Sequence, residues 1–186
     1  MRFADFEAGQ VISAGPVTLT EAELLAFARA YDPQWFHTDP AAAAQGRFGG
    51  LIARGWQTCG IAMRLMADAA LAGSESFASP GLAYVKWPHP VRAGDVLSLR
   101  ATVLETRRAS SQPTLGILRW RWQLFNAAGA EVLDLEATSL FDLTPGAARA
   151  PQSPGICGAF SCTLRVERLR MLILIISTPS EKAIAK

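Results

Sequence analysis

The spacing of apolar residues changes once along the chain, from a helical period to a strand period. Between residues 20 and 71 apolar residues recur as they do on one face of a helix. After Gly81 they alternate with polar residues, as on a strand with one buried face. The pattern predicts helices over 20–31, 39–45 and 55–71 and strands over 11–19, 82–87, 97–103, 118–124 and 133–141. A long helix followed by an antiparallel sheet long enough to wrap it predicts an α+β fold.

Local signals fix the ends of the first two predicted helices. Thr20 and Glu23 form a capping box, in which the hydroxyl and the carboxylate bind reciprocal backbone amides. Asp32 should end the first helix, because the proline that follows disfavours the helical conformation in the residue before it. Asp39 is a good N-cap for the second helix, whose first residue is a proline. Asp32 and His37 therefore lie on a connection between helices, where functional side chains are often displayed.

The third predicted helix, over 55–71, is apolar nearly all round. Trp56, Cys59 and Met63 lie on one face, whereas Ile61 and Leu65 lie elsewhere around the axis. A helix with this pattern is usually buried, so we expect it to form the centre of the core.

Length and composition favour one globular domain. The chain has 186 residues, of which 50% are apolar and 18% charged, and this composition supports a large core. We expect the domain to cover residues 1–143. Residues 144–186 begin with a Pro/Gly/Ala linker and continue as an atypical C-terminal tail, which either docks as an extra element or lacks fixed structure. The apolar run at 171–176 is far short of the roughly 20 residues that span a bilayer, so no membrane span is expected.

The charge and the cysteine and histidine content further narrow the class of protein to which this chain can belong. The formal charge of +2 does not indicate a basic surface for binding a polyanion, so no nucleic-acid partner is expected. The arginines between residues 92 and 121 are interpreted as residues on the solvated faces of strands. The three cysteines form neither a disulfide framework nor a paired metal pattern, and the acidic N-terminus is no signal peptide. These features predict the reducing cytoplasm. Two histidines in the whole chain argue against a metal hydrolase, so no metal is expected.

Asp32, His37 and the start of the third helix together suggest chemistry on an acyl thioester. Hydration of an α,β-unsaturated thioester needs a base that takes a proton from water as the water attacks the β carbon. Asp32 can accept that proton, and His37 can hold the same water and share in the transfer, because imidazole titrates near working pH. The thioester oxygen gains negative charge as an enolate forms. The Gly55 amide, at a helix N-terminus, is a natural donor to that oxyanion.

The same residues also have structural explanations, which the sequence leaves open. Asp32 can simply end its helix, and His37 can fill a turn. Gly50 and Gly55 can serve tight packing instead of catalysis. Four residues near the proposed site are candidates for substrate binding: Trp35, Phe48, Gly50 and Trp56.

Two sequence blocks resemble the MaoC-like acyl dehydratases, also called (R)-specific enoyl-CoA hydratases. The first is YDPQWFHTDP followed by FGGLIARGW, within 31–56. It is similar to the family signature of aspartate, any residue, asparagine, proline, an apolar residue and histidine, ahead of a glycine-containing helix start. The second, over 84–133, matches the family order of strand, Pro-Val, Gly-Asp, strand, and a paired strand ending in Asn-x-x-Gly. The resemblance covers about residues 3–143.

The resemblance implies a hot-dog fold, in which a curved antiparallel sheet wraps a long central helix. It implies a hydro-lyase of fatty-acid metabolism that acts on a 2-enoyl or 3-hydroxyacyl thioester, with acyl-CoA as substrate. Asp32 and His37 correspond to the water-activating pair, and Gly55 corresponds to the oxyanion amide. No cofactor is implied, since CoA enters only as part of the substrate. A homodimer is implied because one hot-dog unit offers half of a typical site.

The chain departs from the family pattern at four positions. Gln34 and Trp35 stand where the signature has asparagine and proline, and Arg54 replaces a common histidine. Met63 stands where several members have a serine that orients the aspartate. Two alternatives therefore remain. One is a hot-dog acyl-CoA thioesterase, whose catalytic acid usually lies on the central helix, where this chain offers only Asp68. The other is a non-catalytic subunit that binds acyl thioesters.

Overall fold

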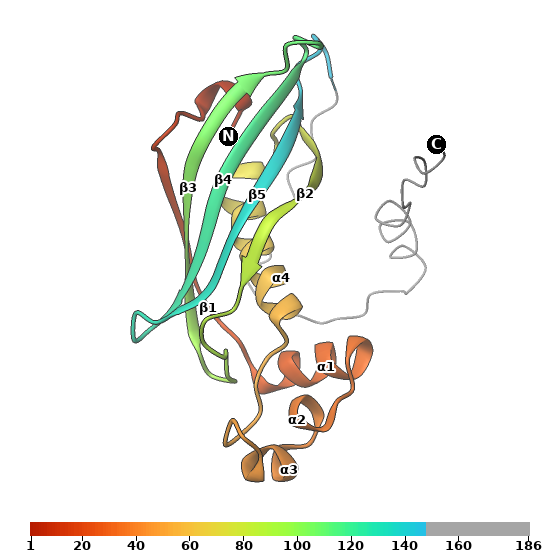
Figure 1. The fold of residues 1–186 in the computed structure, drawn as a ribbon, viewed down its shortest axis with the longest axis vertical. Helices are drawn as coiled ribbons and strands as arrows, with labels where there is room; N and C mark the ends of the chain where they lie inside the picture. The colour runs from red at the N-terminus through yellow and green to blue at the C-terminus, as the bar shows by residue number, and fades with distance from the viewer. Residues whose placement is uncertain (148–186) are drawn as a thin grey trace, which may run out of the picture. The chain divides into compact units, whose positions relative to one another are not determined.

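The alternating segments form a five-stranded antiparallel sheet, which lies against one long helix (Figure 1). The structure is a computed structural model and describes residues 1–147. Its elements in chain order are a 3₁₀ turn η1 (Phe3–Asp5), β1 (Val11–Thr18), α1 (Glu21–Tyr31), α2 (Trp35–Thr38), α3 (Pro40–Gln45), α4 (Gly55–Met66), a π-helical turn η2 (Ala67–Leu71), β2 (Ser76–Lys86), β3 (Val96–Arg108), β4 (Leu115–Asn126) and β5 (Glu131–Asp142). The α+β prediction is confirmed.

The strands are ordered β1-β3-β4-β5-β2, and every neighbouring pair is antiparallel. On β4 the register places Trp120 between Val103 of β3 and Ala137 of β5, and all three side chains are buried. Because side chains alternate along a strand, Arg119 and Arg121 fall on the opposite, outer face. The inner face of the sheet therefore supplies the core, together with one side of α4.

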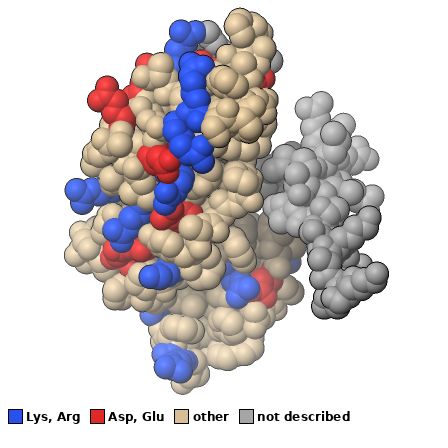
Figure 2. All heavy atoms as spheres, turned by 45° about the horizontal axis from the view of Figure 1, so that its top comes forward, with Lys and Arg blue, Asp and Glu red and all other residues tan. Residues whose placement is uncertain are grey.

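The outer-face arginines are paired with carboxylates from the neighbouring strands. Arg119 binds Glu105 at 2.9 Å and Glu136 at 2.7 Å. Arg121 binds Asp134 at 2.7 Å. Figure 2 shows basic side chains in a row across the sheet with acidic ones beside them. These two arginines therefore lie on the outer strand face, as predicted from the sequence, and form ion pairs with side chains of the neighbouring strands.

Helix α4 is buried on one side only, which corrects the prediction that it is buried all round. The buried side chains of α4 are Gln57, Thr58, Ala62 and Met66. Trp56 and Met63 are 59% and 45% exposed. The sheet covers α4 from one side, so the apolar residues on its other side have no cover within the described part of this chain. The last predicted turn, from Ala67, is a π-helical turn.

Helices α1, α2 and α3 lie beyond one end of the sheet (Figure 1). The predicted capping box is present, with the Glu23 amide donating to Thr20 Oγ1 at 3.2 Å and the Thr20 amide donating to Glu23 Oε2 at 2.9 Å. Asp39 caps α3 by accepting from the amides of Ala41 and Ala42. The short helix α2, which carries His37, was not predicted, because a single turn gives no periodic signal.

The predicted end of the domain at residue 143 stays a prediction. Strand β5 ends at Asp142, and the Leu143 amide donates to the Thr114 carbonyl at 2.8 Å. The proposed linker and C-terminal tail begin at residue 144, and the part from residue 148 onward lies outside the described residues. Within residues 1–147 no helix is long and apolar enough to cross a membrane.

Candidate active site

Asp32 is positioned by the end of α1 and held by two side chains. Its backbone amide donates to the Ala28 carbonyl at 2.8 Å, which closes the last turn of the helix. Gln34 Nε2 donates to both carboxylate oxygens, at 2.8 and 3.0 Å. The guanidinium of Arg54 forms an ion pair with Asp32 Oδ2. The Asp32 side chain is only 16% exposed, so the ion pair is shielded from most of the solvent.

His37 lies in α2 and is 2% exposed. Its Nδ1 atom lies 2.7 Å from the carbonyl oxygen of Ile52. A carbonyl only accepts, so Nδ1 carries the proton and donates it. The other nitrogen, Nε2, is then an acceptor, and it lies 3.1 Å from Arg54 Nη1. The contacts therefore select one neutral tautomer of the imidazole.

Burial lowers the pKa of His37 below its ordinary value of 6.5. The nearby positive charge of Arg54 lowers this pKa further, whereas the hydrogen bond to Ile52 and the negative charge of Asp32 oppose the shift. The imidazole is consequently neutral at neutral pH, the state in which it can accept a proton.

Arg54 is a site residue to which the sequence analysis gave no role. It is the N-cap residue of α4, and it brings Asp32 and His37 into one cluster although its own position is 17 residues beyond His37. The sequence signal was the arginine immediately before Gly55, where related sequences commonly have histidine. That signal marks a departure from the family pattern but does not reveal the contacts.

Gly55 is the first residue of α4, beside the Asp32–Arg54–His37 cluster in sequence. At this position the backbone amide has no partner within its own helix, so it can donate to a ligand. A Cβ atom built at Gly55 would overlap the indole ring of Trp87. The glycine is therefore required by packing, and its role as oxyanion donor stays a prediction.

Three of the four candidate substrate residues line one small cavity. Trp35, Phe48 and Gly50 surround a space of about 130 Å³ together with Phe36, Ala43, Gly46 and Arg47. Phe36 also packs against His37, with the two ring centroids 4.2 Å apart, but His37 itself is not among the residues that line the cavity. The fourth candidate, Trp56, is placed elsewhere, with its ring packed edge-on against Trp87 at 5.7 Å.

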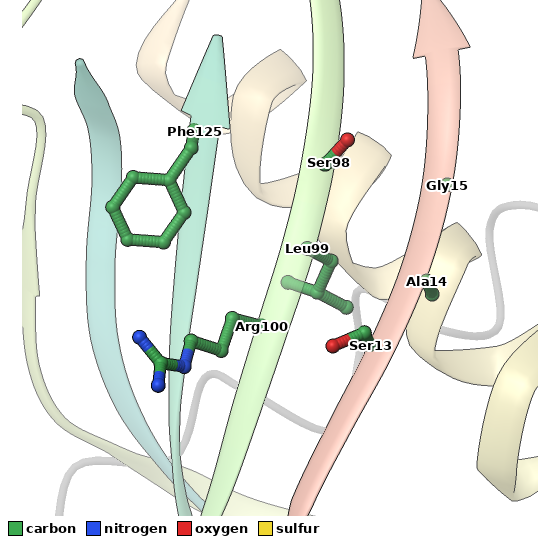
Figure 3. A pocket seen from close by; sticks show the side chains of 7 residues that line it. All are labelled: Ser13, Ala14, Gly15, Ser98, Leu99, Arg100 and Phe125. Carbon is green, nitrogen blue, oxygen red and sulfur yellow. The ribbon is translucent and has the colours of Figure 1, made fainter. Parts of the chain in front are cut away.

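A larger, open hollow of about 320 Å³ lies across β1, β3 and β4, away from the acid and the histidine. Figure 3 shows the Arg100 side chain extending from β3 over β4, near the ring of Phe125. Its lining residues are Ser13, Ala14, Gly15, Ser98, Leu99, Arg100 and Phe125. These residues include no pair suited to acid–base catalysis. The described residues also contain no cluster of three or more side chains able to hold a metal.

The sequence pattern of the MaoC-like domain family matches residues 5–118, more than half of the chain. The chain belongs to this family. The match extends from the 3₁₀ turn at the N-terminus into β4 and includes Asp32, His37, Arg54 and Gly55. It also confirms the family resemblance inferred from the two sequence blocks.

Solved structures of MaoC-like proteins share the fold. A MaoC-like dehydratase from Rhodospirillum rubrum is 32% identical, with a TM-score of 0.70 over 80% of this chain and 97% of that one. An (R)-hydratase from A. caviae, involved in PHA biosynthesis, is 26% identical, with a TM-score of 0.60 over 72% of this chain and 96% of that one. The hot-dog fold is thereby confirmed for this MaoC-like domain.

A curated relative covers part of the chain. The 3-hydroxyacyl-thioester dehydratase Z of Mycobacterium tuberculosis (strain H37Rv) is 40% identical over 88 residues, which are 46% of this chain and 57% of that protein. The family as a whole supports hydration or dehydration of acyl thioesters.

Proposed function

We propose that this MaoC-like protein adds water to a 2-enoyl thioester, or removes it from a 3-hydroxyacyl thioester. One observation carries the proposal: a carboxylate and a neutral imidazole, Asp32 and His37, are held in one cluster at the N-terminus of α4. A base, a second proton-transfer group and a helix N-terminus are the three parts that the reaction requires.

In the hydration direction, Asp32 takes a proton from water as the water oxygen bonds to the β carbon. His37 holds the same water through Nε2, which then accepts from the water instead of from Arg54. The electron pair of the double bond moves to form an enolate, whose oxygen accepts a hydrogen bond from the Gly55 amide. The α carbon then takes the proton that Asp32 received from the water, which returns Asp32 to its carboxylate form and completes the addition of one water. Dehydration uses the same groups in reverse.

The named relatives support this reaction class and its stereochemistry. The proteins with similar structure are called a dehydratase and an (R)-hydratase, and the curated relative is called a 3-hydroxyacyl-thioester dehydratase. We therefore propose an (R)-3-hydroxyacyl product. We also propose acyl-CoA as the substrate, without a separate cofactor, and the cytoplasm as its location.

We propose that the smaller cavity, whose lining residue Phe36 packs against His37, contributes to substrate binding. Trp35 and Phe48 supply aromatic surface, and Gly50 leaves room along the backbone. Trp56, near the same helix start, is proposed to contact substrate or a second subunit, because it is exposed.

The thioesterase alternative is less well supported by the geometry. Asp68, the acid that this reading would use, lies in the π-helical turn η2 and is exposed. Its carboxylate is bound at 2.7 Å by Arg64. Asp68 therefore lacks the partly buried position of Asp32, which Arg54 links to a histidine.

A direct assay tests the reaction. Purified protein is incubated with trans-2-enoyl-CoA substrates of short and medium chain length. We expect it to hydrate the conjugated double bond and to form the (R)-3-hydroxyacyl product. Ultraviolet absorbance measures the loss of the double bond. Release of free CoA thiol without loss of the double bond would instead identify a thioesterase. Stoichiometric binding with neither reaction would identify a non-catalytic subunit.

We further propose that the protein is a homodimer, because one edge of the sheet and one side of α4 carry apolar side chains that residues 1–147 leave uncovered. In the part of the chain that the structure describes, strand β2 has a partner only on its β5 side, and Phe77 and Leu82 on it are exposed. Trp56 and Met63 are exposed on α4. An open edge strand with exposed apolar residues is normally paired or covered, and a second copy supplies both covers at once.

The dimer is testable by mass in solution. Light scattering is expected to give about twice the chain mass of 20.0 kDa. Leu82→Lys should shift the protein toward monomer, because it places a charge at the proposed interface. Val11→Lys, at the opposite edge strand β1, is the matched control and should leave the mass unchanged. Monomeric wild type, or equal effects of both substitutions, would contradict the proposed interface.

A further inference from the structure

Arg54 contacts both proposed catalytic side chains through different nitrogen atoms of one planar group. Its Nη2 atom forms the ion pair with Asp32, and its Nη1 atom lies 3.1 Å from His37 Nε2. A guanidinium presents its N–H donors in a rigid fork, so two such contacts fix both the spacing and the relative orientation of the partners.

The backbone of Arg54 is itself fixed by the start of α4. Its carbonyl oxygen accepts from the Thr58 amide at 3.0 Å and from the Thr58 hydroxyl at 3.2 Å. Thr58 is buried, whereas the Arg54 side chain is 30% exposed. The guanidinium therefore extends from an anchored position to the rim of the site.

The hydrogen-bonding capacity of His37 limits what can bind there at the same time. Nδ1 donates to Ile52, and Nε2 has a single lone pair, which accepts from Arg54 in this structure. A water held by His37 must take that lone pair from Arg54. The Asp32 carboxylate has lone pairs beyond those that bind Gln34 and Arg54, so its ion pair with Arg54 can persist while it also binds the water.

We propose that Arg54 is a positioning residue of this site. Its Nη2 contact holds the Asp32 carboxylate throughout the reaction, and its Nη1 contact keeps His37 in the neutral Nδ1–H form until a water replaces it at Nε2. The bridge, by which we mean the two contacts of Arg54 with Asp32 and His37, does not depend on which reaction is catalysed. The replacement of Arg54 by water at His37 Nε2 rests on the proposed function.

Kinetics of two substitutions test the positioning role. Arg54→Gln removes the charge and the fork, and it is expected to lower kcat for hydration by about 10- to 100-fold with little change in KM, because the reacting groups lose their alignment. Arg54→Lys keeps the charge and should retain part of kcat. The matched control is Arg64→Gln, which breaks an exposed ion pair on the same helix and should leave kcat unchanged.

The pKa of His37 gives a readout that a merely structural role would not move. The charged groups that act on His37 are Arg54 and Asp32, and the positive charge of Arg54 lowers its pKa. Arg54→Gln should therefore raise the pKa of His37 and move the acid limb of kcat/KM to higher pH, whereas Arg54→Lys should leave both near the wild-type values. Since the chain has two histidines, NMR titration in a His89→Gln background follows the His37 imidazole alone.

The NMR and kinetic results separate this proposal from the proposed function. A higher pKa of His37 in Arg54→Gln, but not in Arg54→Lys or Arg64→Gln, supports the bridge even if no enoyl thioester is hydrated. The same pKa in all variants overturns the bridge. An active wild type whose kcat does not change in Arg54→Gln overturns the positioning role while leaving the hydratase function intact.

Discussion

An Asp32→Asn variant is expected to lose about 100- to 10,000-fold in kcat for hydration of an enoyl thioester, the range over which a positioned general base contributes. Asparagine has the shape of aspartate and can still accept from Gln34 and Arg54 through its side-chain oxygen. It cannot take a proton from water. The fold should therefore persist while the reaction stops, as measured by double-bond loss and by circular dichroism on the same sample.

Asp39→Asn is the matched control, because Asp39 lies seven residues away and only caps α3. Asparagine is as good an N-cap as aspartate, so this variant should retain full activity and stability. Equal loss of activity in both variants would show that the helical segment, and not the Asp32 carboxylate, is what the reaction needs. Full activity in Asp32→Asn would exclude Asp32 as the base.

A Gly55→Ala variant is expected to be less stable by about 1–3 kcal/mol, the usual cost of forcing an extra carbon into a packed site. The new methyl group would overlap the rigid ring of Trp87, so this ring, which is 41% exposed, must move away from the start of α4. Trp87 in turn packs against Trp56, so the disturbance should reach the start of α4. Thermal or urea unfolding measures the loss.

Gly60→Ala provides the control on the same helix. A Cβ at Gly60 meets nothing within 4 Å, so alanine there should stabilise the helix by about 0.5–1 kcal/mol through its better propensity. If Gly55→Ala were also stabilising, the close packing against Trp87 would be wrong. Alanine keeps the backbone amide, so a Gly55→Ala variant whose stability is restored by Trp87→Leu, but whose kcat stays low, would indicate that a Cβ at position 55 keeps the substrate oxygen away from that amide.

The local elements were predictable from the sequence because their signals lie within a few residues of one another. The capping box at Thr20 and Glu23 and the Asp32-Pro33 end of α1 needed no knowledge of the rest of the chain. Alternation along β4 likewise identified Trp120 as inward and Arg119 as outward. Such patterns reflect backbone geometry and burial on one face, which any tertiary arrangement of these elements must respect.

The family motif also placed Asp32, His37 and Gly55 near one another in sequence, but it did not give their contacts. The buried side of α4 was not predictable either. Met63 and Met66 are equally apolar, yet one is exposed and the other fully buried, because only the sheet decides which side is covered.

The sequence by itself determined the order and type of the main elements, the α+β fold and the segment that carries the candidate site. Only the tertiary structure decided that Arg54 bridges Asp32 and His37, that Ile52 selects the imidazole tautomer, and that Trp87 requires a glycine at position 55. These contacts join residues that are 15 to 32 positions apart in the sequence. The contact of Trp87 with Gly55, for example, forms where the end of β2 meets the start of α4. Local propensity and periodicity cannot encode them, since they depend on which side chains the folded core brings together.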